Sequence, residues 1–284
     1  MRKGRSEQNR DGLCVKDRIN GHQSKKILSL PFYWRDSLIM QTTIVIPCYN
    51  EAERLNKAEF LAYLRDHADV QFLFVNDGSR DNTLEVLKAF SEEHPQVQYL
   101  DVQPNGGKAE AVRRGMLHAA EHFQSDYIGF WDADLATPLY EIDHFLANAQ
   151  RKDFDIVTGL RLARLGAEVR RKNLRHYIGR CFATVASSLL RIPVYDTQCG
   201  SKLYKSNVVK DLFTDSFVTR WLFDVEILAR YKQQHGRERA LTRIYEYPLL
   251  AWEDVNGSKL KITDFLKAPF ELLKIRRKYL RHNR

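Results

Sequence analysis

The stretch Tyr127-Ile-Gly-Phe-Trp-Asp-Ala-Asp134 joins an apolar run to two carboxylates. The run from Tyr127 to Trp131 predicts a buried strand. Asp132 and Asp134 follow where this strand leaves the sheet, and in an extended backbone positions i and i+2 share a face. Two carboxylates so close together repel each other unless a cation or a shared proton offsets their charge. The pair suggests either a Mg²⁺ or Mn²⁺ site that also takes the phosphates of a nucleotide, or simple caps of the next helix.

The chain has 284 residues, of which 44% are hydrophobic and 29% are charged, and its formal net charge is +9. This length and composition fit one large α/β domain with room for an appended element. The positive charge indicates an anionic partner: nucleic acid, an anionic lipid headgroup or a phosphorylated substrate. The four cysteines are far apart in sequence and argue against a zinc site or a disulfide framework. The sequence has no apolar run of roughly 18 residues, the length that a membrane-spanning helix needs.

Apolar runs and amphipathic segments alternate along the chain. They predict strands at 42–46, 70–75, 97–102, 127–131 and 155–159, and helices at 52–66, at 81–93 and from the turn at 105–108 to 122. This alternation predicts an α/β fold with a doubly wound, mostly parallel sheet, whose ligands bind beyond the carboxyl ends of the strands. We expect a disordered or loosely docked basic leader at 1–39, a catalytic domain at 40–260 and a basic amphipathic tail at 261–284. Met40, just before the first strand, is one candidate for the natural start.

Two further strand-end loops carry polar residues suited to the same ligand. Asp77 can accept hydrogen bonds from a base or a ribose hydroxyl. Gly106 and Gly107 allow backbone N–H groups to approach a phosphate at a helix N-terminus, and Lys108 adds a positive charge there. The alternatives are a helix cap for Asp77 and an ordinary tight turn for the glycines. All of these features beside an aspartate pair favour one nucleotide site.

Several motifs together resemble the family 2 glycosyltransferases of the GT-A fold. The motifs are Thr43-Ile-Val-Ile-Pro-Cys-Tyr-Asn-Glu51, Val75-Asn-Asp-Gly-Ser79, Asn105-Gly-Gly-Lys108 and Trp131-Asp-Ala-Asp134. Later segments resemble the branch that uses polyprenyl phosphates: Asp196-Thr-Gln-Cys-Gly-Ser-Lys-Leu203, Arg220-Trp-Leu-Phe-Asp-Val-Glu226 and Gly257-Ser-Lys-Leu260. Within that branch the chain is most similar to the dolichyl-phosphate β-glucosyltransferase subgroup, followed by the mannose synthases.

The resemblance implies a role for each matching residue. The positions that contact the base and ribose of the donor are Pro47, Tyr49, Glu51 and Asp77, with Lys108 close to that pocket. Asp132 and Asp134 match the motif that holds the donor diphosphate through Mg²⁺ or Mn²⁺. Two residues depart from the pattern, since Asn76 replaces a first aspartate and Ala136 replaces a glutamine of the mannose synthases. The second departure favours the glucosyl-type subgroup.

The acceptor side is predicted after the fifth strand, where arginines precede an apolar helical stripe. A lipid phosphate needs cations for its head and apolar helices for its chain; a helix with solvated arginines and a core-facing stripe is the alternative. Arg161 and Arg175 are expected to position the acceptor phosphate. Asp224 is the candidate base or sugar contact, with an ion pair to a nearby arginine as its alternative role. The resemblance adds Ser258 and Lys259 as part of a loop that closes on the diphosphate.

The tail from Ile262 to Arg284 interleaves apolar residues with lysines and arginines. A basic amphipathic segment can lie in the membrane interface, where each cation near an anionic surface contributes about 1 kcal/mol. We therefore expect peripheral attachment to the cytoplasmic face of a membrane. An exposed basic helix whose apolar stripe faces the core is the alternative.

The expected reaction is metal-dependent, inverting transfer of a hexose from a nucleotide-sugar to a polyprenyl phosphate, either dolichyl or undecaprenyl. The resemblance favours UDP-glucose as the donor, with GDP-mannose as the other candidate. A family 2 transferase with a saccharide hydroxyl acceptor would share the donor half but would need a true base. A basic nucleic-acid-binding module would explain the charge but not the aspartate pair, so no nucleic-acid partner is expected.

Overall fold

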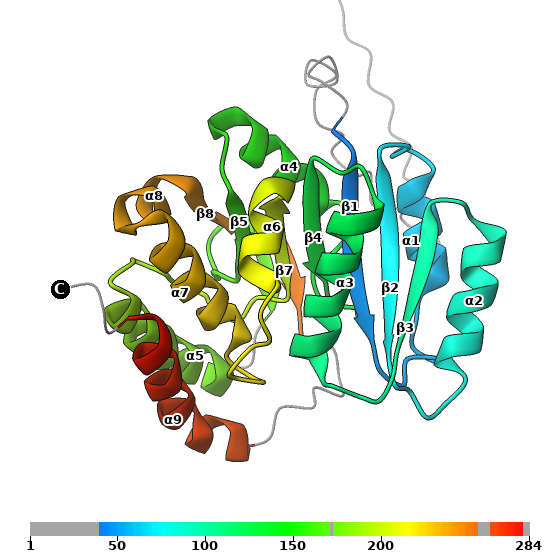
Figure 1. Ribbon diagram of the computed structural model, residues 1–284. Helices are drawn as coiled ribbons and strands as arrows, with labels where there is room; N and C mark the ends of the chain where they lie inside the picture. Colours follow the sequence, from blue (N-terminus) through cyan, green and yellow to red (C-terminus); the bar gives the residue numbers. More distant parts are fainter. Residues whose placement is uncertain (1–39, 171–172, 255–261, 281–284) are drawn as a thin grey trace, which may run out of the picture. The chain divides into compact units, whose positions relative to one another are not determined.

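The computed structural model describes residues 40–170, 173–254 and 262–280, with the backbone alone described for 173–178 and 262–266. The predicted leader at 1–39 and the predicted closing loop with Ser258 and Lys259 lie outside these residues. Figure 1 shows the described part as a twisted sheet with helices on both faces. The elements are, in chain order, β1 (Thr42–Cys48), α1 (Lys57–Leu64), β2 (Val70–Asp77), α2 (Thr83–Glu93), β3 (Val97–Val102), α3 (Lys108–His122), β4 (Tyr127–Trp131), α4 (Glu141–Lys152), β5 (Ile156–Leu160), β6 (Glu168–Arg170), α5 (Asn173–Leu190), β7 (Ser201–Lys205), α6 (Ser206–Phe213), α7 (Phe223–His235), α8 (Arg237–Arg243), β8 (Ile244–Pro248), β9 (Ala251–Glu253) and α9 (Ile262–Tyr279).

The main sheet has seven strands in the order β3-β2-β1-β4-β7-β5-β8. All neighbouring strands in it are parallel except β7, which runs antiparallel to both β4 and β5. The prediction of a doubly wound, mostly parallel sheet is confirmed. Because β7 is antiparallel, Ser201 at its start pairs with Trp131 at the end of β4. The residues around the start of β7 therefore lie beside the aspartate pair.

The alternation of side chains along the strands divides the core between the two faces of the sheet. Val45 and Phe130 belong to one cluster, which includes residues of α3, α6, α7 and α9. Ile44 and Trp131 belong to the other, which includes residues of α1, α2 and α4. Successive strand residues point to opposite faces, so near-continuous apolar runs suit a sheet that is covered on both sides.

Two predicted boundaries differ from the structure. β1 continues through Pro47, which pairs with Val75 of β2, whereas its pairing with β4 ends at Val45. Proline is tolerated there because that side of the strand no longer needs its N–H group. The helix predicted at 52–66 begins only at Lys57, since the preceding residues form a turn in which Leu55 N–H donates to the Glu51 carbonyl oxygen.

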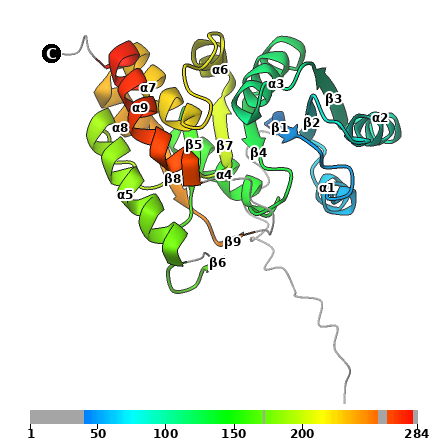
Figure 2. The same cartoon turned by 90° about the horizontal axis from the view of Figure 1, so that it is seen from below.

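Helices α5 and α9 lie side by side in both views (Figures 1 and 2). Among the side chains of these helices that the structure describes, the buried ones are Ala183, Ala186 and Leu190 of α5 and Ala268, Leu272, Ile275 and Tyr279 of α9. Ile275, expected in a membrane-facing stripe, is fully buried, so the core-facing alternative is correct for that side of α9. Phe270 and Leu273 are instead 68% and 45% exposed. Helical periodicity shows which residues share a face but not what covers it.

Candidate active site

The carboxyl ends of β1, β2 and β4 meet at the lower edge of the sheet in Figure 1, which Figure 2 shows from below. The loops after β1 and β2 are joined by hydrogen bonds: Asn50 N–H donates to Ser79 Oγ over 3.1 Å and Glu51 N–H donates to Thr83 Oγ1 over 2.8 Å. Pro47, Tyr49 and Glu51, the predicted donor-binding residues of the first loop, are all partly exposed at this edge.

Asp77 is buried and holds the loop before α3. Its Oδ1 accepts the Gly106 N–H at 2.8 Å, and its Oδ2 accepts the Gly107 N–H at 2.8 Å and the Asn105 side-chain amide at 2.9 Å. The glycine N–H groups, expected to face a phosphate, thus point at a carboxylate of the protein. Asp77 thus supports the start of the helix that carries Lys108. Its contact with the base or ribose of a nucleotide remains a prediction.

Lys108 is the first residue of α3 and forms an ion pair with Asp132. Partial loss of solvent opposes the charged form of Lys108, whose side chain is 45% exposed, but Asp132, Asp224 and Asp134 outweigh this effect and raise its pKa. All three aspartates therefore act on one ammonium group. The site is a single charged cluster that combines α3, the end of β4 and the start of α7.

The aspartate pair lies in a turn rather than in the extended backbone that its spacing suggested. Leu135 N–H donates to the Asp132 carbonyl oxygen over 3.2 Å, and Leu135 has a φ of 54°. Because α4 begins only at Glu141, the alternative that the pair caps this helix is wrong. Burial and the neighbouring Asp132 raise the pKa of Asp134. This repulsion is what a bound cation would offset.

The carboxylates at the turn are suitable ligands for a hard divalent cation, but they would supply only part of its coordination shell. Two carboxylates, those of Asp132 and Asp134, are available at the turn. Among the residues that the structure describes, no cluster of three or more histidines, cysteines and acidic residues could hold a metal alone. Mg²⁺ is commonly held by one or two carboxylates and by substrate phosphates. Oxygens of a diphosphate could complete such a shell here.

Asp224, the second residue of α7, is buried and paired with Lys202. The Lys202 ammonium lies 2.7 Å from Asp224 Oδ1, is 3% exposed and lies 5.3 Å from the centre of the Phe130 ring. Burial raises the pKa of Asp224, while Lys202 and Lys108 oppose this rise. The partner is thus a lysine rather than the arginine considered from sequence. Lys202 itself was missed as a site residue; the available signal was its place in the motif Asp196–Leu203.

Arg161 follows β5 and is held by Asp196. Its Nε and Nη2 donate to the two carboxylate oxygens over 2.7 and 2.8 Å, and its guanidinium lies 5.3 Å from the Trp252 ring. Burial opposes the charged form of Arg161, but Asp196, and more weakly Asp132, raise its pKa, so Arg161 also interacts electrostatically with the cluster. Arg175 lies near the start of α5, but its side chain is outside the described residues, as are Ser258 and Lys259.

Comparison with known proteins agrees with this geometry. Residues 43–213 match the family model described as glycosyl transferase family 2. The chain belongs to glycosyl transferase family 2. This family 2 enzyme is 32% identical over 249 residues to a dolichyl-phosphate beta-glucosyltransferase of Trichomonas vaginalis, covering 82% of this chain and 70% of the relative. It is 30% identical to the human dolichyl-phosphate beta-glucosyltransferase, covering 89% and 79% of the two chains.

Solved structures give the same fold for the family 2 enzyme. Glucosyl-3-phosphoglycerate synthase from Mycobacterium tuberculosis, solved in complex with Mn²⁺, UDP and glucosyl-3-phosphoglycerate, is 16% identical, with a TM-score of 0.60 over 83% of this chain and 80% of that one. Another crystal structure of that synthase is a complex with Mg²⁺ and UDP. The prediction of a GT-A glycosyltransferase is confirmed. Within the described part of the family 2 enzyme, the helices are too short or too polar to cross a membrane.

Gly200 provides a test of how tightly Asp132 is held. A Cβ atom at this position would lie 1.9 Å from Asp132 Oδ2 and 2.4 Å from its Cγ, so Gly200→Ala must displace the carboxylate or the start of β7. We expect kcat to fall by about 10-fold or more, because small displacements of catalytic groups are costly. If the effect acts through Asp132, adding Gly200→Ala to Asp132→Ala should change kcat little further. If Gly200→Ala lowers kcat by the same factor in the wild type and in Asp132→Ala, its effect does not act through Asp132.

Proposed function

We propose that this family 2 enzyme transfers glucose from UDP-glucose to the phosphate of a dolichyl-type polyprenyl lipid, with inversion at the anomeric carbon. The observation that carries the proposal is the cluster of Asp132, Asp134, Lys108 and Asp224 at the carboxyl edge of the sheet. The names of the relatives support the sugar and the acceptor class. The ligands of the solved synthase support a uridine nucleotide and a divalent metal.

On the donor side, Asp132 and Asp134 would hold Mg²⁺ or Mn²⁺, which when bound offsets the negative charge of the diphosphate. Lys108 adds a further positive charge from the start of α3, and Asp77 keeps that start in place. The base and ribose are proposed to lie against the loops after β1 and β2. The residues assigned to this contact are Pro47, Tyr49, Glu51 and Asp77.

In the transfer step, an acceptor phosphate oxygen forms a bond to the anomeric carbon while the bond from that carbon to the UDP oxygen breaks. The attacking oxygen is already anionic, so no strong base has to remove a proton. Arg161, fixed by Asp196, is proposed to attract the acceptor phosphate together with Arg175. Asp224, fixed by Lys202, is proposed to contact the hydroxyl groups of the glucose.

The lipid acceptor requires contact with a membrane, and α9 offers a suitable outer face. Phe270 and Leu273 are exposed there, and Lys267, Lys274 and Arg277 are exposed on the same helix. An apolar and basic surface can lie in the interface of a bilayer with anionic lipids. We propose that the enzyme attaches through this face to the cytoplasmic side of a membrane.

Transfer of labelled glucose tests the proposal. The full chain is incubated with Mn²⁺, labelled UDP-glucose and dolichyl phosphate in detergent, and the lipid product is extracted. We expect label in the lipid as a β-glucosyl phosphate, and less transfer from GDP-mannose. Parallel samples replace the lipid with a free saccharide or with nucleic acid. Transfer of glucose to the saccharide alone, or no transfer to any of these acceptors, would contradict the proposal.

A further inference from the structure

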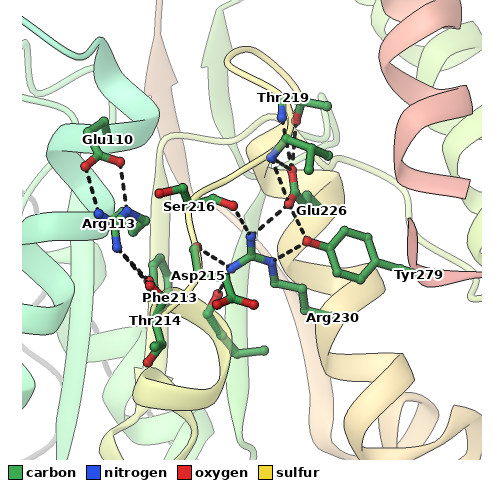
Figure 3. Close-up of polar contacts among 12 residues, drawn as sticks. Glu110, Arg113, Phe213, Thr214, Asp215, Ser216, Thr219, Glu226, Arg230 and Tyr279 are labelled. Atoms are coloured by element: carbon green, nitrogen blue, oxygen red, sulfur yellow. Dashed lines mark hydrogen bonds and ion pairs between the residues drawn. The ribbon is translucent and has the colours of Figure 1, made fainter. Parts of the chain in front are cut away.

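The loop at residues 214–222, which leads into α7, is held by a buried glutamate. Glu226 of α7 is fully buried, and its carboxylate accepts the N–H groups of Val218 at 3.0 Å and of Thr219 at 3.2 Å, together with the Thr219 hydroxyl at 3.2 Å. Figure 3 shows this carboxylate directed at the loop. A buried charge is tolerated when its hydrogen-bonding capacity is used in this way.

Arg230, one helical turn further along α7, holds the other part of the same loop. Its Nη1 donates to the carbonyl oxygens of Leu212 and Asp215 over 2.8 Å, and its Nη2 donates to the Ser216 carbonyl over 2.9 Å and to Glu226 Oε1 over 2.8 Å. The ion pair between Glu226 and Arg230 therefore acts mainly as a frame for backbone groups. Such a buried network fixes one conformation when every member is satisfied.

Helix α9 completes this frame from a distant part of the sequence. The Tyr279 hydroxyl donates to Glu226 Oε1 over 2.7 Å and accepts from Arg230 Nε over 3.2 Å (Figure 3). Glu271, two turns earlier on the same helix, accepts the N–H of Leu222 over 3.3 Å. Leu222 is the residue that caps the start of α7. α9 thus makes polar contacts with the frame and with the end of the loop.

The loop is joined to both sides of the charged cluster. Asp224 comes two residues after Leu222, so a shift of the loop end would move it relative to Lys202. On the donor side, Arg113 of α3 donates to the carbonyl oxygens of Phe213 and Thr214 over 3.3 and 3.0 Å (Figure 3). Arg113 belongs to the helix whose first residue is Lys108. The loop therefore connects α9 with the helices that carry these charges.

We propose that Tyr279 and Glu271 are positioning residues, through which α9 keeps the loop at 214–222 and thereby Asp224 in the geometry needed for transfer. The inference rests on the function proposed for Asp224. Phe270 and Leu273, on the outer side of α9, are exposed and belong to the proposed membrane face. One helix would then make the geometry of the active site depend on how the protein lies on the lipid surface.

Tyr279→Phe and Glu271→Met test this inference, because both keep the approximate size of the side chain and remove the group that makes the hydrogen bond. Tyr279→Phe keeps the buried ring and removes only its hydroxyl. We expect kcat for glucose transfer to fall by about 10-fold in Tyr279→Phe, with a change of less than about two-fold in the KM for UDP-glucose. Tyr99→Phe on the exposed side of β3 is the matched control and should leave both constants unchanged.

Amide hydrogen exchange in the same variants separates positioning from general stability. The Val218, Thr219 and Leu222 amides should exchange faster, while amides of β1 and β2 should keep their wild-type rates. Wild-type kcat in Tyr279→Phe, or equally faster exchange throughout the sheet, would overturn the inference. If the wild-type enzyme itself transfers no glucose, the proposed function fails. Amide hydrogen exchange at the loop would still decide whether α9 holds the loop in place.

Discussion

Asp134→Asn is expected to lower kcat for glucose transfer by at least about 1000-fold, because it removes one of the two charges that would hold the divalent cation. The same change should leave the free energy of unfolding unchanged or raise it. Burial and Asp132 raise the pKa of Asp134, so its ionised carboxylate is less favourable in the folded protein than in the unfolded chain. Asparagine keeps the shape of the side chain and removes this cost.

Three measurements check this expectation: kcat, thermal unfolding, and Mn²⁺ binding in the presence of UDP followed by electron paramagnetic resonance. Asp66→Asn, at an exposed position after α1, is the matched control and should behave as the wild type in all three. Full activity in Asp134→Asn would remove the metal assignment. A fall in thermal stability together with the loss of activity would show that Asp134 is needed for folding rather than for the cation.

Strands with strong apolar runs could be predicted from sequence, whereas elements that depend on tertiary pairing could not. The bounds of β3 and β4 are those predicted. β4 is buried at every position and leaves a clear apolar run, whereas β3 is an edge strand with exposed positions at Tyr99 and Asp101. β7 has lysines at its second and last positions, and nothing local indicates that it runs antiparallel between β4 and β5. The turn before α1 also shares its polar composition with a helix start.

In the candidate site, too, some features follow from local sequence patterns and others depend on tertiary contacts. The rule that parallel strands end at one edge of the sheet brings together Asp77, Lys108 and the aspartate pair, although they are far apart in sequence. It says nothing about Lys202, whose importance comes from Asp224 on a separate helix. It also misses that Asp77 uses its carboxylate on the loop before α3. Such contacts are three-dimensional, and spacing in the sequence does not encode them.

Three of the four aspartates of the site have a cation beside them. Asp132 is paired with Lys108, Asp224 with Lys202 and Asp196 with Arg161. Asp134 differs, because the hydrogen bond to its carboxylate comes from a backbone group, the Ala136 N–H, rather than from a cation. Of these four aspartates it is the one whose environment most favours an added cation. This charge pattern supports the proposal that the metal binds at the turn rather than at α7.

The second large effect is expected for Lys202→Met, which removes a buried ammonium and keeps an apolar chain. Asp224 would remain buried without its partner, and breaking a buried pair in this way costs about 3 kcal/mol or more of unfolding free energy. We also expect kcat to fall by about 100-fold or more, since Asp224 would lose the group that fixes it. Lys205→Met, on the same strand, breaks an exposed pair with Asp153 and should cost less than about 1 kcal/mol.

A double variant and a pH profile separate the two effects of Lys202→Met. In Lys202→Met/Asp224→Asn the unpaired charge is gone, so most of the unfolding free energy should return while kcat stays low. Burial already raises the pKa of Asp224, and loss of the ammonium raises it further. If transfer needs the ionised carboxylate, activity is lost as the pH falls through this pKa, and in Lys202→Met that loss should begin at a higher pH than in the wild type. An unshifted profile with wild-type kcat would mean that Asp224 is structural.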